Sequence, residues 1–263
     1  MTVKRRPVPG DSADSSDNAD SSDSADRLAD LVAATVTETG HAERGRLLGV
    51  LARLLVGSAR VAGVRAVAGG RWLAEQLIEA APRIPVRDAV LLRRHHPDKT
   101  DDEIADTLVR HAARATAAIG AAAGAMVTVE YAVPAALLAV PAQLAAETLA
   151  VAAVEIKLVA ELHELYGEEA RGTLTERGTA YLMSWMRQRV VEPAVASTGL
   201  AAVLGSAAQR ELRTHLLRRV GRSSSSLAPL LAGAVAGAEV NRRTTRSLGE
   251  KLTAELRGRQ AGR

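Results

Sequence analysis

The sequence contains no cysteine and no phenylalanine, and aromatic residues make up only 2% of its 263 residues. Without cysteine the chain can form neither a disulfide framework nor a thiolate site. A β-sheet core is also disfavoured, because such cores rely on aromatic and β-branched residues. Hydrophobic residues nevertheless account for 47% of the chain, so alanine, valine, leucine and glycine must fill the core. Small residues of this kind favour helices that pack closely against one another.

Long apolar runs are missing as well. The longest stretches without a charged residue are residues 115–129, 131–146, 193–209 and 223–238. Each is shorter than the roughly 18 apolar residues that a transmembrane helix needs. We interpret them as buried core helices, with short interfacial or re-entrant membrane segments as the alternative. No apolar segment follows the basic residues near the N-terminus, so we expect no signal peptide. We therefore expect a cytoplasmic location, either free or peripheral on the inner face of the cell membrane.

The two ends of the chain differ in composition from the middle. Near the N-terminus an aspartate recurs at every third position, and alanine is the largest apolar residue in this run. Such a segment cannot bury enough apolar surface to offset the entropy lost on ordering. We therefore predict a disordered acidic tail over residues 1–25 and a disordered C-terminus over residues 258–263. Between them we expect N-terminal helices at residues 26–85 and a helical core at residues 86–257.

The middle of the chain follows a helical period, and no stretch alternates polar and apolar residues with a period of two. We therefore predict an all-α fold, a multi-helix bundle of about seven to eight Ala- and Gly-rich helices without a sheet. Thr100 and Glu103 form a capping box at the start of one helix. The second helix is expected to weaken at Gly63 or at Gly69 and Gly70. The predicted helices cover residues 26–38, 42–81, 86–95, 100–129, 141–166, 173–190, 193–220 and 227–257.

The histidines near residue 95 suggest two kinds of function. Residues 95–99 read HHPDK, and His-Pro-Asp is the signature of J-domain co-chaperones, where it also lies between two helices. The tyrosine-rich helix that precedes this tripeptide in J-domains is missing, so we interpret the segment as a polar turn. His95, His96, Asp98 and Asp101 share one loop, and no HExxH pattern occurs. We therefore expect no metal and no other cofactor.

Four glutamates are candidates for buried carboxylates. Glu155 lies on the apolar side of the helix predicted over residues 141–166, and Glu147 and Glu161 lie on its polar stripe. Glu130 stands between two apolar residues. A buried carboxylate needs a partner, or its pKa rises. We favour internal ion pairs or hydrogen bonds to a neighbouring helix. The alternative is an enzyme in which at least two of these carboxylates line one cavity.

The last predicted helix carries a ridge of small residues. Pro229, Gly233, Gly237 and Asn241 recur every four residues, which is the spacing of a row that packs closely against another helix. A phosphate-binding loop is the alternative, but the spacing matches neither GxGxxG nor GxxxxGK[ST]. We therefore predict a helix-packing ridge.

Arginines dominate the second predicted helix. Arg46, Arg53 and Arg60 follow one another at heptad spacing, and no acidic residue occurs between Arg44 and Arg71. A basic amphipathic helix is typical of proteins that bind an anionic membrane surface or an acidic partner. A solvated surface is the alternative. Because no aromatic stacking platform or DNA-binding motif accompanies the arginines, we expect no nucleic acid partner.

Two blocks of the sequence resemble the EcsC-like family of helical bacterial proteins. One is the helix over residues 140–169, which begins with a proline and ends in a Tyr-Gly turn. The other is the ridge-bearing helix over residues 227–252, and the similarity spans residues 93–256. The family has no established catalytic activity, and its name comes from a gene beside ABC-transporter genes. The resemblance therefore implies a cytoplasmic or membrane-associated helical protein.

The sequence as a whole predicts a non-enzymatic helical interaction protein, peripheral to the membrane or to a membrane complex. Its expected partner is an anionic membrane surface or a membrane protein. Two alternatives stay open. One is an enzyme that uses the buried carboxylates, and the other is a soluble structural module.

Overall fold

The computed structural model describes residues 13–38, 40–62, 71–130, 140–190 and 228–262. These residues form eight α-helices, one 3-10 turn and no strand, which confirms the predicted all-α bundle. The elements are α1 (Ala13–Thr37), α2 (His41–Ala62), α4 (Arg71–Ala80), η1 (Ala81–Arg83), α5 (Ala89–His95), α6 (Asp101–Glu130), α7 (Val140–Leu165), α8 (Leu174–Val190) and α11 (Ala228–Ala261). The helix predicted over residues 193–220 lies outside the described residues.

Local hydrogen bonds fix the ends of several helices. At the start of α6 the Thr100 hydroxyl accepts the Glu103 N–H (3.3 Å), and the Glu103 carboxylate accepts the Thr100 N–H (2.8 Å). Thr173 and Glu176 form the same reciprocal pair at the start of α8. Gly167 follows α7 with φ of +71°, a left-handed conformation that glycine adopts without strain. These capping interactions place the helix ends at or near their predicted positions.

The first helix begins earlier than predicted. α1 starts at Ala13 and so includes residues 13–25 of the segment for which we predicted disorder. The apolar half of α1 is anchored in the core, and a helix propagates more easily than it nucleates. Asp23 pairs with Arg27 one turn later (2.7 Å), and Arg83 contacts Asp26 and Asp30. Aspartates near a helix N-terminus also interact favourably with the helix dipole and so stabilise the helix.

The last helix also exceeds its predicted length. α11 continues to Ala261, beyond the expected end near residue 257. Arg259 in this extension pairs with Glu168, which follows α7, at 2.9 Å and contacts Glu255 on its own helix. The predicted disordered C-terminus is therefore helical over residues 258–261.

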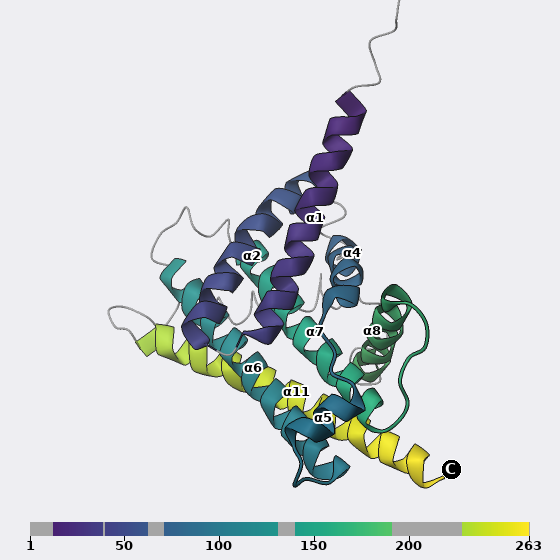
Figure 1. Ribbon diagram of the computed structural model, residues 1–263. Coiled ribbons are helices and arrows are strands. Elements are labelled where there is room, and N and C mark those ends of the chain that lie inside the picture. Colours follow the sequence, from purple (N-terminus) through teal and green to yellow (C-terminus); the bar gives the residue numbers. More distant parts are fainter. Residues whose placement is uncertain (1–12, 39, 63–70, 131–139, 191–227, 263) are drawn as a thin grey trace, which may run out of the picture.

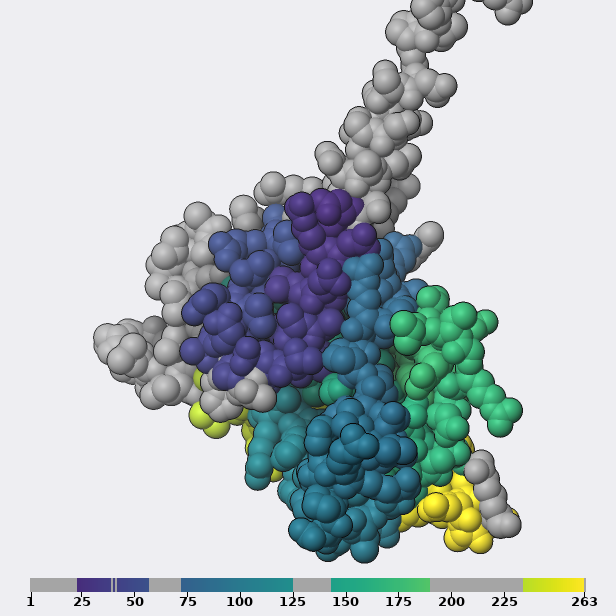
Figure 2. All heavy atoms as spheres, in the orientation of Figure 1, coloured from purple at the N-terminus to yellow at the C-terminus, as the bar shows by residue number. Residues whose placement is uncertain are grey.

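One core joins the N-terminal helices to the rest of the molecule. Helix α7 lies in the middle and contacts α1, α2, α4, α6, α8 and α11 (Figure 1). The buried cluster extends from Leu28 in α1 to Leu256 in α11 without a division between the segments at residues 26–85 and 86–257. Figure 2 shows α1 and α2 packed side by side on one face. None of the helices that the structure describes is both long enough and apolar enough to cross a membrane.

Helices α6 and α11 run beside each other over much of their length, and they touch at two glycines (Figure 1). A Cβ atom at Gly237 would stand 2.5 Å from the Gly120 carbonyl oxygen, well inside van der Waals contact. A Cβ at Gly120 would meet the Gly237 backbone in the same way. Backbone therefore lies directly on backbone at this crossing.

Candidate functional site

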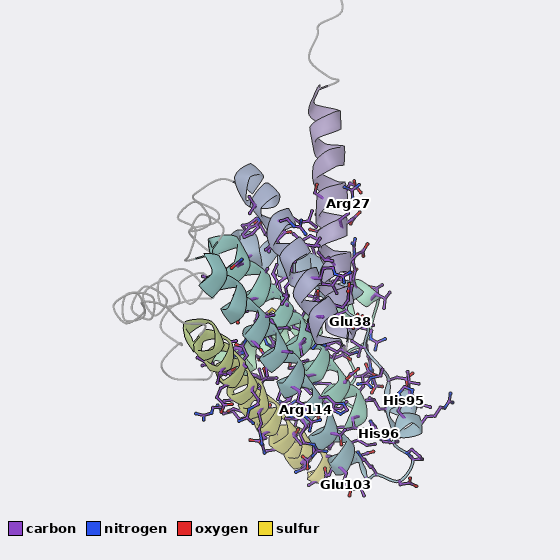
Figure 3. All side chains as sticks on the ribbon, turned by 90° about the vertical axis from the view of Figure 1, so that its left-hand side faces the viewer. Arg27, Glu38, His95, His96, Glu103 and Arg114 are labelled. Carbon is purple, nitrogen blue, oxygen red and sulfur yellow. The ribbon has the colours of Figure 1, made fainter. Side chains whose placement is uncertain are left out.

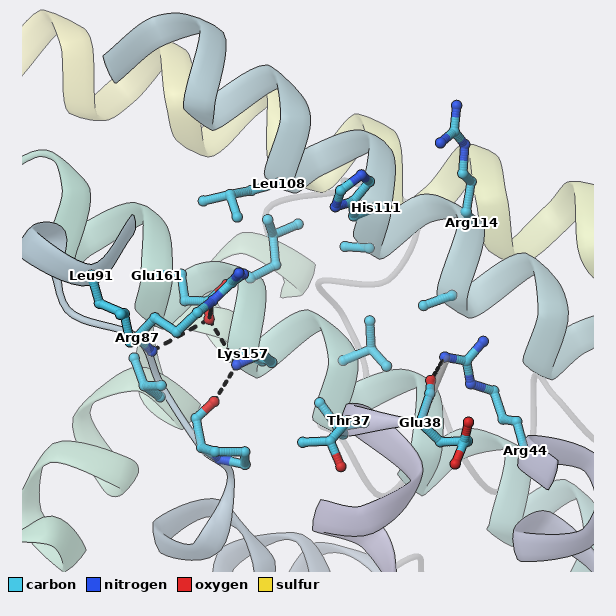
Figure 4. Close-up of a pocket in the computed structure, with 17 residues that line it drawn as sticks. Thr37, Glu38, Arg44, Arg87, Leu91, Leu108, His111, Arg114, Lys157 and Glu161 are labelled. Carbon is cyan, nitrogen blue, oxygen red and sulfur yellow. Dashed lines mark hydrogen bonds and ion pairs between the residues drawn. The ribbon is translucent and has the colours of Figure 1, made fainter. Parts of the chain in front are cut away.

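A groove of about 780 Å³ lies between α1, α2, α6, α7 and the segment that leads into α5 (Figure 4). Aliphatic side chains form most of its walls. They include Val36, Val86, Leu91, Leu108, Val154 and Leu158. Four Arg or Lys side chains also line the groove, against two carboxylates. The groove therefore combines an apolar interior with an excess of positive charge.

Arg44 carries the positive charge at one end of the groove. The residue is only 6% exposed, and its guanidinium donates to the main-chain carbonyl of Glu38, while its Nε has no partner. The Glu38 carboxylate instead accepts the Gly40 N–H (2.6 Å). Burial lowers the pKa of Arg44, although the charge of Glu38 opposes this effect. A buried cation without an ion-pair partner is energetically costly.

Arg87, Lys157 and Glu161 occupy the other end. Arg87 donates to both oxygens of Glu161 at 2.7 Å, and Lys157 reaches the same carboxylate at 2.7 Å. Lys157 also donates to the Pro85 carbonyl. Burial acts to raise the pKa of Glu161, but the hydrogen bonds and charges of Arg87 and Lys157 outweigh it and the pKa is lowered. Two cations share one carboxylate, so this end keeps a positive charge.

His111 and Arg114 project from α6 at the rim of the groove (Figure 4). The pKa of His111 is lowered, first by partial burial and then by nearby positive charges, of which Arg114 is the largest contributor. The arginines that contribute to this shift, Arg114, Arg110 and Arg87, also make the electrostatic potential at the rim more positive, which favours anions.

The predicted carboxylates do not share a site. Glu155 is fully buried and accepts hydrogen bonds from Trp185 (2.8 Å), Arg189 (3.0 Å) and Thr245 (2.7 Å). Glu147 accepts the Asn241 amide (2.8 Å), and its pKa is raised by burial, which the Asn241 hydrogen bond partly opposes.

Glu161 alone among these glutamates lines the groove. The side chain of Glu130 lies outside the described residues. Glu147, Glu155 and Glu161 therefore each have their own hydrogen-bond partners, and no two of these three share one. The enzyme hypothesis required at least two of these carboxylates in one cavity, and the three that the structure describes do not meet this requirement.

The small-residue ridge faces two neighbouring helices. Gly237 lies on Gly120 of α6, and Asn241 donates to Glu147 of α7. Pro229 and Gly233 belong to the first turns of α11, and their packing lies outside the described part of the chain.

Helix α2 has an exposed face that carries arginines and a buried face that carries leucines. Arg46 and Arg53 are exposed, whereas Leu48, Leu51 and Leu55 are buried in the core. Arg46 pairs with Glu43 at 3.2 Å, and the Arg53 Nε donates to the Gly49 carbonyl at 3.2 Å. The side chain of Arg60 lies outside the described residues. The predicted basic surface is thus exposed at the two positions that can be placed.

Sequence reasoning missed the groove and the burial of Arg44. A signal was present, because Arg44, Leu48, Leu51 and Leu55 share one helical face at spacings of four, three and four residues. It also missed a buried contact between Ser184 and His163 (3.3 Å), in which the other ring nitrogen of His163 lies 2.7 Å from the Val159 carbonyl. Neither side chain lines the groove, and we interpret the contact as polar packing between α7 and α8.

The HHPDK segment connects α5 to α6. The Lys99 N–H donates to the His96 carbonyl (3.1 Å), which closes a turn after α5 ends at His95. Figure 3 places His95 and His96 at the same end of the molecule as Glu103, in the first turn of α6. Over the residues that the structure describes, no three His, Asp or Glu side chains are grouped to hold a metal ion.

Comparisons of the chain with protein-family models, with curated proteins and with solved structures return no match. The resemblance to the EcsC-like family therefore stays a prediction from the sequence.

Proposed function

We propose that the protein is a non-enzymatic helical interaction protein that docks peripherally on an anionic membrane surface, on the cytoplasmic side. The observation that carries this proposal is the outward orientation of Arg46 and Arg53 on α2. The leucines of the same helix are used in the core, so α2 offers charge to a membrane and no large apolar face. Docking would therefore rest on surface electrostatics, which are reversible and screened by salt.

A comparison with α11 supports the choice of α2. Arg242 and Arg243 are also exposed, but both contact Glu239 on their own helix, and these contacts lower the pKa of Glu239 to about 2. That carboxylate offsets part of their charge, as Glu43 does for Arg46 (3.2 Å). The two helices differ at Arg53, with which no carboxylate pairs among the described residues. Arg53 therefore keeps its full charge for anionic lipid, which supports the choice of α2.

Co-sedimentation with vesicles tests the proposal. The full chain should bind vesicles that contain phosphatidylglycerol and should not bind vesicles of phosphatidylcholine alone. Because each basic residue near an anionic surface contributes about 1 kcal/mol, the double variant Arg46→Gln/Arg53→Gln should bind about 30-fold more weakly at low salt.

The matched control is Arg242→Gln/Arg243→Gln, which removes the same charge from α11 and should bind much as the unaltered protein does. Equal recovery with neutral and anionic vesicles would refute electrostatic docking. No recovery with either would favour a soluble structural module. The alternative of an enzyme with two carboxylates in one cavity loses support, because Glu147, Glu155 and Glu161 are paired separately.

A further inference from the structure

We propose that the groove between α1, α2, α6 and α7 is a binding site for a small amphiphilic anion, with a carboxylate or phosphate head and an apolar body. The inference does not rest on membrane docking, because it uses different residues. The head would lie against Arg44, with Arg114 adding positive charge at the rim, and the body would lie along the aliphatic walls.

Arg44 supplies the first argument. Its side chain lines the groove and is buried, it has no ion-pair partner among the described residues, and its Nε–H lacks an acceptor. A buried guanidinium left in this state is stabilised by any anion that reaches it. Guanidinium groups also match the planar geometry of a carboxylate and the oxygens of a phosphate.

The surrounding charges supply the second argument. Figure 4 places Arg114 and Arg44 toward one end of the groove and Arg87 and Lys157 toward the other. Two carboxylates line the groove. Glu161 is already occupied by Arg87 and Lys157 at 2.7 Å. The charge of Glu38 attracts Arg44, but its carboxylate accepts the Gly40 N–H (2.6 Å) and forms no ion pair with Arg44, and the four cations outnumber the two carboxylates. The lowered pKa of His111 is consistent with the same positive potential. A cationic ligand would be repelled from this groove.

The walls determine what accompanies the anionic head. Leu108, Val154 and Leu158 present aliphatic surface to the groove, and its volume of about 780 Å³ lies within the range of small-molecule sites. An inorganic anion would leave this surface exposed to water. An alkyl chain would cover this surface and remove it from water, which is favourable. The ligand that fits both features is an amphiphile.

Isothermal titration calorimetry with the full chain tests the site. Dodecanoate and dodecyl phosphate, both below their micelle-forming concentrations, are the probes. Dodecanol, dodecyltrimethylammonium and inorganic phosphate separate the contributions of charge and apolar body. At least one of the two anionic amphiphiles should bind, and more tightly than each of the three controls. Equal binding of dodecanol, or of inorganic phosphate, would overturn the proposal.

Two substitutions, at the exposed Arg114 and the partly exposed Ala115, locate the binding. Arg114→Gln removes a positive charge from the rim of the groove and should weaken dodecanoate binding by about tenfold. Ala115→Trp places a large ring in the groove without changing its charge and should abolish binding. Arg53→Gln, on the docking surface of α2, is the control and should leave dodecanoate binding unchanged. Binding that survives in both groove variants would show that the anion binds elsewhere.

The Nε–H resonance of Arg44 gives a readout that needs no substitution at this buried residue. It should shift when dodecanoate is added and should not respond to dodecanol. A resonance that ignores dodecanoate would remove Arg44 from the site. The outcomes are also separable from those of the vesicle experiment, because Arg53→Gln weakens only docking and Arg114→Gln weakens only groove binding.

Discussion

Two partly or fully buried glutamates on α7, Glu161 and Glu147, differ in the partners that surround their carboxylates. Glu161 has two cations as partners, and its pKa falls despite burial. Glu147 has only the neutral amide of Asn241, and burial raises its pKa. The folded state therefore gains stability from ionised Glu161 above its ordinary pKa of 4.5 and loses that gain as the pH falls through the lowered folded value. For Glu147 the sign is opposite, and stability declines as the pH rises above 4.5.

Glu155 allows a direct test at the scale of one residue. Glu155→Gln removes the negative charge that pairs with Arg189. It also replaces one carboxylate oxygen by an NH2 group, which cannot accept a hydrogen bond from the donors on α8 or α11. Because Glu155 is fully buried, we expect a loss of about 2–4 kcal/mol in the free energy of unfolding, measured with urea.

The control for this substitution is Glu250→Gln, which breaks the exposed pair between Glu250 and Arg246 on α11. Exposed pairs of this kind contribute at most about 1 kcal/mol. If the two variants lose the same stability, the network around Glu155 does not bind α7 to α8 and α11.

At the scale of helices, local chemistry made most boundaries predictable. Thr100 and Glu103 are neighbours in sequence, so their capping box could be recognised before the fold was known. The extent of α1 was not predicted, because its start at Ala13 lies within the acidic segment. A helix that is anchored in the core can propagate into a neighbouring polar segment, and the composition of that segment does not reveal this.

The crossing of α6 and α11 gives the prediction at this scale. Gly120→Ala and Gly237→Ala each place a methyl group against the backbone of the other helix, so each should cost about 2–4 kcal/mol in thermal unfolding. Gly49→Ala in α2 is the control, because nothing lies within 4 Å of its Cβ position. That substitution should raise stability by up to about 1 kcal/mol, as alanine is the better helix former. A crossing that tolerates both alanines without loss would mean that the two helices can separate at little cost.

At the scale of the whole molecule, the groove shows what periodicity cannot reveal. Its lining comes from five separate stretches of chain, from Val36 near the end of α1 to Glu161 near the end of α7. Helical periodicity assigned each residue to a face but gave no information on which faces meet. For this reason neither the burial of Arg44 nor the pairing of Arg87 with Glu161 was predicted.

The shared core predicts that the molecule unfolds as one unit. The chain has two tryptophans, and Trp72 in α4 and Trp185 in α8 are both buried. In each single-tryptophan variant, Trp72→Phe and Trp185→Phe, the fluorescence and the circular dichroism at 222 nm should change at the same urea concentration. An earlier loss of the Trp72 signal would instead identify the N-terminal helices as a separate folding unit.

The contact between Gly120 and Gly237 also has an evolutionary consequence. The alanines, valines and leucines around it can exchange with one another over many generations, since their total volume matters more than their identity. The two glycines cannot drift in this way, because any side chain at one of them meets the main chain of the other. Proteins that descend from a common ancestor with this architecture should therefore keep a glycine at both positions after the surrounding helices have lost all recognisable identity.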